Sequence, residues 1–346
     1  MQSLNLCATA ATVLPLSQDP LALSLNENPF PPLPTVRTAI VEATASINRY
    51  PEFLPQQLRT LIAQQLGLST AQIVIGAGAT GVVMEILRVL TRPGERIVMA
   101  FPTFDGYPIF AQIAGLVPVQ VPLDDCGHHD LNAMADAAGD ARVVVLCRPH
   151  NPTGTAHDER DIRRFLSRIA PDTVVLLDEA YVEFLAPPLQ LNVEMLVRDF
   201  PNVVVVRTFS KAYGLAGLRI GYGFCAADIA RQIWATHPPF GSSFISLAAI
   251  EASFRAETEL RKRITAITVE RTFLRIQLRA LGLWTAESHA NFVYLPNQGH
   301  SWAAVFDAAG IRVRPVGKQG VRITVGDRSS TRAVLAAVKP ATRVAL

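Results

Sequence analysis

The sequence predicts an α/β fold in which helices cover both faces of a mostly parallel sheet. Between residues 72 and 224, short runs of β-branched apolar residues alternate with longer segments of helical pattern. The short runs lack polar alternation, which is typical of strands that are buried on both faces. The intervening segments are long enough to be crossover helices, as parallel strands require. Ligands of such folds bind beyond the carboxyl ends of the strands.

The elements of this region can be assigned in chain order. A proline-rich stretch, residues 29–34, is predicted to be an extended arm that leads into a helix from Thr35. Crossover helices are expected to include residues 81–90 and 158–169. The strands are expected at residues 72–75, 96–100, 117–121, 142–147, 173–177, 203–207 and 219–224.

The C-terminal part of the chain predicts a smaller α+β domain. Long helices with Arg and Glu on one face are expected between residues 244 and 281. Short strands are then expected at 291–295, 311–314 and 321–325, with a helix at 302–309 between the first two. We therefore divide the chain into an N-terminal arm that packs with the small domain (1–30), a large domain (31–240) and a small domain (241–346).

The composition excludes several classes of function. Of the 346 residues, 49% are hydrophobic and 18% are charged, which suits a large core, and a net charge of +3 gives no basic surface for nucleic acid. No apolar run is long enough to span a membrane, and the apolar stretch 4–16 lacks the basic residues of an export signal. We expect a cytoplasmic protein whose scattered cysteines are reduced and form neither disulfides nor a zinc site. These cysteines are Cys7, Cys126, Cys147 and Cys225.

Two nucleotide-binding patterns were considered. Residues 76–81 match G-x-G-x-x-G between a predicted strand and helix, but the acid that a dinucleotide fold needs at the end of the next strand is missing. An NAD-dependent oxidoreductase therefore remains only as an alternative, although this loop can still offer backbone N–H groups to a phosphate. A P-loop ATPase is excluded because the first lysine of the chain is Lys211.

Polar residues that can take part in binding or catalysis follow three of the predicted strands. They are the segments 151–154, 178–181 and 207–222, and the carboxyl ends of parallel strands meet at one edge of a sheet. Lys211 is one of only four lysines and stands between a serine and small apolar residues, unlike a typical surface lysine. The sequence therefore predicts one site that contains an amine. The pair His128-His129 lies in an expected surface turn, and we predict no metal site there.

The predicted set of residues suits pyridoxal phosphate. This cofactor needs an amine that condenses with its aldehyde, a carboxylate at its ring nitrogen and a cradle for its phosphate. Lys211 supplies the amine and Asp178 the carboxylate, and we predict that these two and Tyr181 are catalytic. The other expected cofactor contacts are Asn151 and Tyr181 at the phenolic oxygen, Ser210, Arg219, Ala79 and Thr80 at the phosphate, and Phe104 on the ring face.

These motifs give the chain a resemblance to the aminotransferases of fold type I, and specifically to the histidinol-phosphate aminotransferase family. The stretch 207–222 is the most specific of the shared segments. The resemblance covers nearly the whole chain. Its other segments are 26–29, 49–51, 76–81, 102–104, 151–154, 178–181, 290–292 and 321–326.

The resemblance implies a pyridoxal-phosphate-dependent transferase that moves an amino group between L-glutamate and imidazole acetol phosphate, the reverse step using histidinol phosphate and 2-oxoglutarate. It also implies a homodimer in which Tyr50 reaches the cofactor phosphate of the partner chain. Arg322 and Arg314 would bind the anionic end of the substrate, and Asn26 would contribute to substrate binding.

Three segments depart from the histidinol-phosphate members of the family. The loop 76–81 lacks their acidic residues, His150 stands where they often have Asn, and residues 239–243 lack their asparagine. The loop and the apolar surroundings of Phe240 are similar to the aromatic branch of the family, so an aromatic (phenylalanine) aminotransferase is the alternative. A decarboxylase of amino-acid phosphates is a less favoured one. His150 is interpreted equally well as a pocket residue or as a packed core residue.

Overall fold

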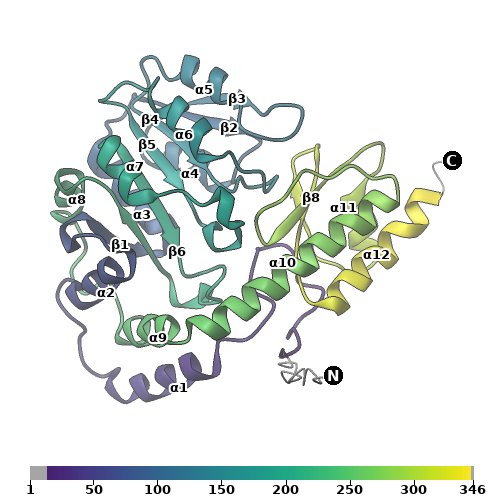
Figure 1. Cartoon of the computed structure of the whole chain (residues 1–346), viewed down its shortest axis with the longest axis horizontal. Coiled ribbons are helices and arrows are strands. Elements are labelled where there is room, and N and C mark those ends of the chain that lie inside the picture. Colours follow the sequence, from purple (N-terminus) through teal and green to yellow (C-terminus); the bar gives the residue numbers. More distant parts are fainter. Residues whose placement is uncertain (1–13, 344–346) are drawn as a thin grey trace, which may run out of the picture.

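The computed structural model describes residues 14–343, and its large domain is built on a seven-stranded sheet in the order β1-β7-β6-β5-β4-β2-β3 (Figure 1). The strands β2 to β6 pair in parallel, whereas β7 is antiparallel to both of its neighbours, β1 and β6. The predicted mostly parallel sheet is confirmed. The strands are β1 (Ile73–Ala77), β2 (Arg96–Phe101), β3 (Val117–Pro122), β4 (Val143–Cys147), β5 (Val174–Asp178), β6 (Val203–Thr208) and β7 (Ile220–Phe224).

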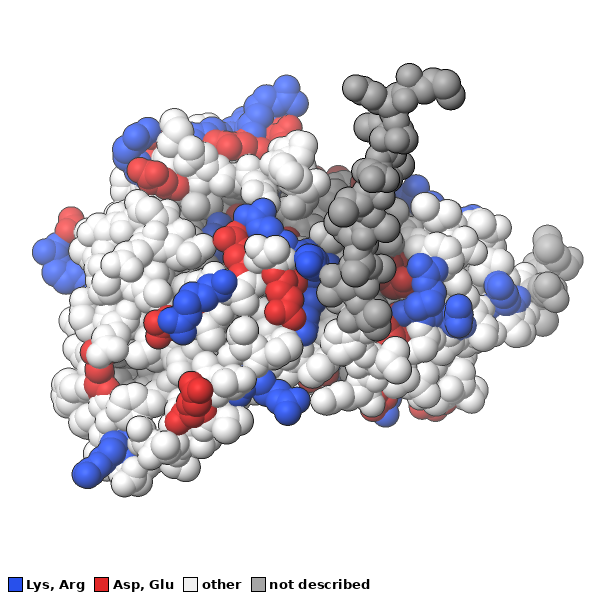
Figure 2. All heavy atoms as spheres, turned by 60° about the horizontal axis from the view of Figure 1, so that its bottom comes forward, with Lys and Arg blue, Asp and Glu red and all other residues white. Residues whose placement is uncertain are grey.

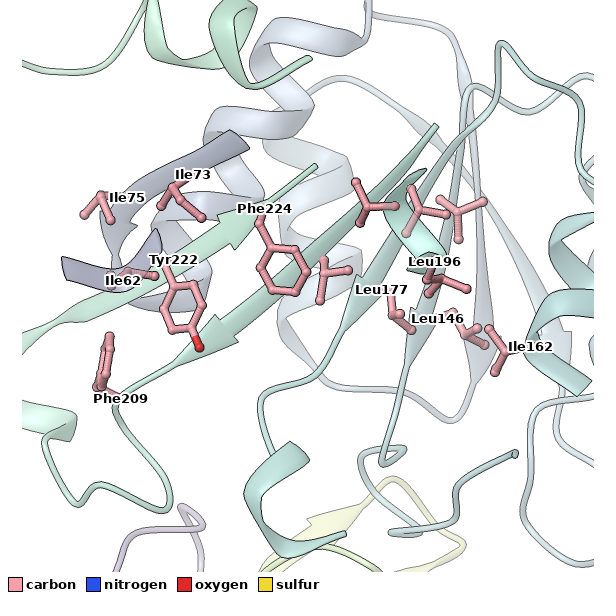
Figure 3. Close-up of a cluster of buried hydrophobic side chains, with 14 of the residues drawn as sticks. Ile62, Ile73, Ile75, Leu146, Ile162, Leu177, Leu196, Phe209, Tyr222 and Phe224 are labelled. Carbon is pink, nitrogen blue, oxygen red and sulfur yellow. The ribbon is translucent and has the colours of Figure 1, made fainter. Parts of the chain in front are cut away.

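Helices cover both faces of this sheet, and each face has its own apolar core. Along β4, Val144 and Leu146 belong to one cluster and Val143 and Val145 to the other, because successive side chains of a strand point to opposite faces. Figure 3 shows part of the first cluster, where Ile62 of a helix lies near Ile73 and Ile75 of β1. The helices of the first face are α1 (Pro34–Ala43), α2 (Gln56–Leu66), α5 (Leu131–Ala137), α6 (Glu159–Leu166), α7 (Val193–Asp199) and α9 (Phe244–Arg255); those of the second are α3 (Gly78–Leu90), α4 (Gly106–Ile113) and α8 (Ala227–Trp234).

A second, antiparallel sheet in the order β8-β10-β9 forms the smaller domain with helices packed on it. Its core is separate and includes Trp302, Phe306 and Ile323. In Figure 1 the long helix α10 runs from the large domain to this smaller lobe. The elements are β8 (Phe292–Pro296), β9 (Arg314–Val316), β10 (Gly320–Thr324), α10 (Glu257–Ala280), α11 (Trp302–Ala308) and α12 (Arg328–Arg343).

The N-terminal segment crosses from one domain to the other. Leu23 lies in the small-domain core, its N–H donates to the carbonyl of Arg312 (2.8 Å) and its carbonyl accepts from Thr324 N–H (2.9 Å). The first part of the predicted arm, residues 1–13, lies outside the described residues. The rest of the arm runs along the edge of the small sheet and then passes into α1, which begins at Pro34.

Two local expectations differ from the structure. The second small-domain strand in chain order was expected at residues 311–314, but β9 begins only at Arg314. Arg312 pairs with Ala22 of the arm instead. Helix α9 lies just after the predicted domain division at residue 240, yet its buried residues Ala249 and Ile250 belong to a core of the large sheet. The division itself stays a prediction, as does the cytoplasmic location. No helix in the described range is long and apolar enough to cross a membrane.

Candidate active site

A pocket lies at the carboxyl ends of β4, β5 and β6, where the sequence placed the site. The nine residues predicted to contact the cofactor from within one chain all line it, whereas Tyr50, Arg322, Arg314 and Asn26 are not among its lining residues. Leu25 and Glu27 of the N-terminal arm close the pocket from the small-domain side. The nine are Ala79, Thr80, Phe104, Asn151, Asp178, Tyr181, Ser210, Lys211 and Arg219.

The carboxylate of Asp178 is held at the end of β5 in a buried position. Its Oδ1 accepts from the N–H of Ala180 (2.9 Å), and its Oδ2 accepts from the hydroxyl of Tyr107. Burial raises the pKa of Asp178, while the two hydrogen bonds oppose this effect. A buried carboxylate of this kind is stabilised by a nearby cationic N–H, and the protonated ring nitrogen of pyridoxal phosphate is such a group.

Tyr107 was not predicted from the sequence. It is fully buried on α4, and its ring packs edge-on against Phe104 (centroids 5.6 Å apart). It follows Phe104 by three residues, and its N–H donates to the carbonyl of Phe104 (3.0 Å) in the turn that begins α4. That spacing was the available signal, but a tyrosine at a helix start is more often a packing residue.

Lys211 follows β6 and its amine lies at the pocket, where Nζ donates to the carbonyl of Leu25 (2.9 Å). Burial and the positive charges of Arg322 and Arg219 lower its pKa to about 8, although the acids Glu27 and Asp178 act in the opposite direction. A lysine is nucleophilic only when it is neutral. The site therefore prepares Lys211 to condense with an aldehyde at moderate pH.

This pKa predicts how attachment of the cofactor depends on pH. When pyridoxal phosphate is added to the cofactor-free protein, the rate of covalent attachment should rise with pH and reach half of its maximum near pH 8. The neutral fraction of an ordinary lysine would still be below about 1% at that pH. Stopped-flow absorbance can follow the reaction, with the Lys211→Ala protein as blank. A midpoint near pH 10 would contradict the assignment.

A phosphate cradle forms where the start of α3 meets Arg219. Gly78 has φ +74°, a backbone conformation that favours glycine, and a Cβ there would displace the guanidinium of Arg219. Arg219 is itself held in the left-handed region, with φ +53°, and Nη1 donates to the carbonyl of Ala216 (2.8 Å) and reaches Ser210 Oγ (3.5 Å). Backbone N–H groups of a helix start, a serine and an arginine together suit a phosphate.

The same geometry explains the G-x-G-x-x-G pattern without a dinucleotide. A Cβ at Gly76 would meet the backbone nitrogen of Val82, so this glycine lets α3 pack on β1. Gly78 makes room for Arg219, as described above. The pattern thus follows from close packing around the start of α3, and no dinucleotide is needed to explain it.

A chain of hydrogen bonds joins Tyr181 to the small domain. Asn26 Nδ2 (2.9 Å) and Asn151 Nδ2 (3.3 Å) both donate to the Tyr181 hydroxyl oxygen, whose own hydrogen stays free to be donated into the pocket. Burial raises the pKa of Tyr181, so the hydroxyl remains protonated. Asn26 also contacts Thr324 of β10, and its amide therefore supports Tyr181 and does not line the pocket.

Arg322 of β10 is the main candidate for binding the substrate anion. It is only 8% exposed, Nη1 donates to Asn151 Oδ1 (2.7 Å) and Nη2 to the carbonyl of Ser24 (2.6 Å). Its Nε has no hydrogen-bond partner, and no carboxylate lies within ion-pair distance of it among the described residues. Burial lowers the pKa of Arg322, which an incoming carboxylate would reverse. A buried guanidinium without a counter-ion suits a substrate carboxylate.

The remaining predicted residues lie outside the pocket. Tyr50 is 80% exposed and packs against Phe240, so it does not contact the pocket of its own chain. Arg314 is paired with Asp105. His150 is fully buried, bonds Thr153 through Nδ1 (2.9 Å) and has its pKa lowered to about 3 by burial, so the structure supports the packing interpretation. Among the described residues, no group of three or more possible ligands is placed to hold a metal ion.

A parallel sheet with a lysine after β6, a buried carboxylate at the end of β5 and a phosphate cradle between them defines the class of fold type I pyridoxal-phosphate enzymes. Within this class, residues 18–342 match the family "Aminotransferase class I and II", and the chain belongs to it. It is a pyridoxal-phosphate-dependent aminotransferase, as predicted. The family favours transamination over decarboxylation and over NAD-dependent oxidation.

Individual relatives point to two substrate classes. The chain is 41% identical over 311 residues to an aromatic amino acid aminotransferase of Streptomyces avermitilis (89% of this chain, 87% of the relative). It is 42% identical over 308 residues to the enzyme of that name from Streptomyces coelicolor (88% and 86%). A solved histidinol-phosphate aminotransferase from Sinorhizobium meliloti, in complex with pyridoxal-5'-phosphate, superimposes with a TM-score of 0.86 at 28% identity (94% and 92% covered).

The residues present fit the cofactor, and their roles follow from their positions. When bound, pyridoxal phosphate withdraws the electron pair released at the α-carbon of an amino acid. Asp178 would keep the ring nitrogen protonated, Tyr181 would donate its hydroxyl hydrogen to the phenolic oxygen, and Arg322 would orient the substrate carboxylate. Lys211 Nζ, once freed from the aldehyde, would take and return the α-proton as general base and acid.

Proposed function

We propose that this protein is an aromatic amino acid aminotransferase, which exchanges the amino group between an aromatic amino acid such as phenylalanine and 2-oxoglutarate. The observation that carries the proposal is the similarity to enzymes of that name at 41–42% identity over almost nine-tenths of the chain. Histidinol phosphate, the main substrate expected from the sequence, is supported by a solved structure at only 28% identity. The alternative interpretation of the sequence is therefore the better supported one.

The side chains around the pocket agree with an aromatic substrate. Apart from Glu27 and Thr208, its polar lining groups belong to the cofactor set or, like Tyr107, contact it, and the rest of the lining is mostly apolar and includes Leu25, Val83 and Phe110. Arg322 provides one buried cation for one carboxylate. A 2-oxo acid with an uncharged ring needs no further cation. The site thus suits a substrate with a single anionic group.

A comparison of acceptors tests the proposal. The aminated enzyme is mixed in single-turnover experiments with phenylpyruvate and, separately, with imidazole acetol phosphate. We expect kcat/KM for phenylpyruvate to be higher by at least about tenfold, because the wrong side chain in a shaped apolar pocket costs 10- to 200-fold. A preference for imidazole acetol phosphate would instead establish histidinol phosphate as the substrate.

We also propose that the enzyme works as a homodimer with shared sites. Tyr50, Phe53 and Phe240 form an exposed aromatic cluster, with ring centroids 4.8 and 5.2 Å apart. Val41 and Ile47 are exposed nearby in the chain, and Figure 2 shows broad uncharged areas on the side where α1 and α9 lie. Exposed apolar patches of this kind are typical of protein interfaces. Sedimentation of the holoenzyme checks this point, since a fully active monomer would contradict it.

A further inference from the structure

Two arginines of the small sheet stand directly opposite each other. Arg314 of β9 and Arg322 of β10 are partners in an antiparallel register, so their side chains start from the same face of the sheet. Like charges in such a pair destabilise the sheet. The two differ in their surroundings, because Arg322 has no carboxylate partner, whereas Arg314 has one in Asp105 of the large domain.

Asp105 stands at the start of α4, where an aspartate is expected to cap the helix. It is the N-cap residue of α4, and an aspartate there usually accepts a hydrogen bond from a backbone N–H of the first turn. Its side chain makes no such bond. Instead, Oδ2 accepts from both Nε (3.0 Å) and Nη2 of Arg314. The carboxylate therefore neutralises an arginine of the other domain at the expense of its own helix.

The pair lies outside the pocket lining but close to residues of the site. Asp105 directly follows Phe104, which lines the pocket, and precedes Tyr107, which holds Asp178. Arg314 and Asp105 also act on Arg322 electrostatically, Arg314 lowering and Asp105 raising its pKa, although burial is the larger cause. Whether Arg314 is neutralised therefore changes the positive charge that an anionic substrate meets.

We propose that Asp105 is a specificity-determining residue that, by neutralising Arg314, favours substrates with one carboxylate and an uncharged side chain over those with a second anionic group. This inference rests on the proposed aromatic substrate and explains how the site would select it. A second anionic group on the substrate, such as a side-chain carboxylate or a phosphate, can pair with Arg314 only after it displaces the Asp105 carboxylate. A dicarboxylic donor such as glutamate therefore still reacts, but with a lower kcat/KM than a free Arg314 would allow.

The test uses Asp105→Asn holoenzyme, which keeps the shape of the side chain and removes its charge. The half-reaction is measured with phenylalanine, with glutamate and with histidinol phosphate. We expect the ratio of kcat/KM for glutamate to that for phenylalanine to rise two- to fivefold, and the ratio for histidinol phosphate to rise likewise. A two- to fivefold change is the size of effect expected from a partly exposed ion pair, and the side chains of Asp105 and Arg314 are 59% and 46% exposed. Asp105→Glu, which retains the charge, should restore the wild-type ratio.

Two further variants separate this role from a structural one. Asp19→Asn removes a similarly exposed pair between the N-terminal arm and Arg312 of the small domain, and Asp19 does not line the pocket, so the ratios of this variant should stay unchanged. In an Arg314→Gln background, Asp105→Asn should no longer change either ratio. Unchanged ratios in Asp105→Asn, or an equal rise in Asp19→Asn, would overturn the proposal. The substrate preference of the wild-type enzyme tests the proposed function. The change in the kcat/KM ratios from wild type to Asp105→Asn tests this inference, so either can fail alone.

Discussion

Replacing Lys211 by alanine is expected to reduce transamination by at least about 10⁴-fold, because one amine serves both covalent attachment and proton transfer. The Nζ of Lys211 lies in the pocket together with Asp178 and Arg219. No other lysine lines this pocket, so no side chain can replace it. The variant should also lose the visible absorption band of the attached cofactor, even if pyridoxal phosphate still binds noncovalently through the cradle.

Absorbance spectra, cofactor content and single-turnover rates measure the effect separately. Lys318→Ala serves as the matched control, because this lysine is exposed in the turn before β10 and should leave all three quantities unchanged. Added methylamine should restore part of the proton-transfer rate in Lys211→Ala, since the shortened side chain leaves room beside the reacting carbon. Wild-type turnover in this variant would disprove the mechanism.

The large sheet could be predicted because its signals are local. In β4 and β5, runs of Val and Leu are buried on both faces, and such runs are recognisable without knowledge of their neighbours. The polar residues just after these strands met at one edge because parallel strands end together. This is why Asn151, Asp178 and Lys211 could be placed in a common site from the sequence.

The residues that the sequence did not reveal depend on contacts between distant segments. Tyr107 acts through Asp178, 71 positions further along the chain, and Asp105 through Arg314, 209 positions away. Neither contact leaves a pattern in the local sequence. The start of β9 was misplaced for the same reason, since the backbone of Arg312 pairs with the N-terminal arm, which no periodicity within residues 311–316 indicates.

The substrate was harder to predict than the cofactor for a physical reason. Most of the expected cofactor contacts follow strands of one sheet, whereas the expected substrate contacts come from the arm and the small domain, which meet that sheet only in the folded chain. Arg322 illustrates this difference, because its proposed role as an anion site rests on the unpaired Nε and on the bonds to Asn151 and Ser24. Composition and spacing do not distinguish it from the other arginines, and only the family resemblance singled it out.

Asp178→Asn should lower kcat of the cofactor-loaded enzyme by about a hundredfold or more, which is the loss when a preorganised charge partner is removed from an active site. Asparagine keeps the size of the side chain, and its single oxygen can still accept from Ala180 N–H while its NH2 group donates to the Tyr107 hydroxyl oxygen. It cannot balance the positive charge on a protonated ring nitrogen. The ring nitrogen of the cofactor would then lose its proton, and the cofactor ring would withdraw electrons from the α-carbon of the substrate less strongly.

The Asp178→Asn substitution should lower the reaction rate without lowering the stability of the fold. Since burial raises the pKa of Asp178, removal of its charge relieves an unfavourable desolvation, and the thermal stability of the cofactor-free variant should be equal to or above that of the wild type. Asp199→Asn, which disrupts an exposed pair with Arg163 (2.9 Å), is the matched control and should retain kcat. Rates are compared after correction for bound cofactor. A kcat within threefold of wild type would show that Asp178 does not hold the ring nitrogen.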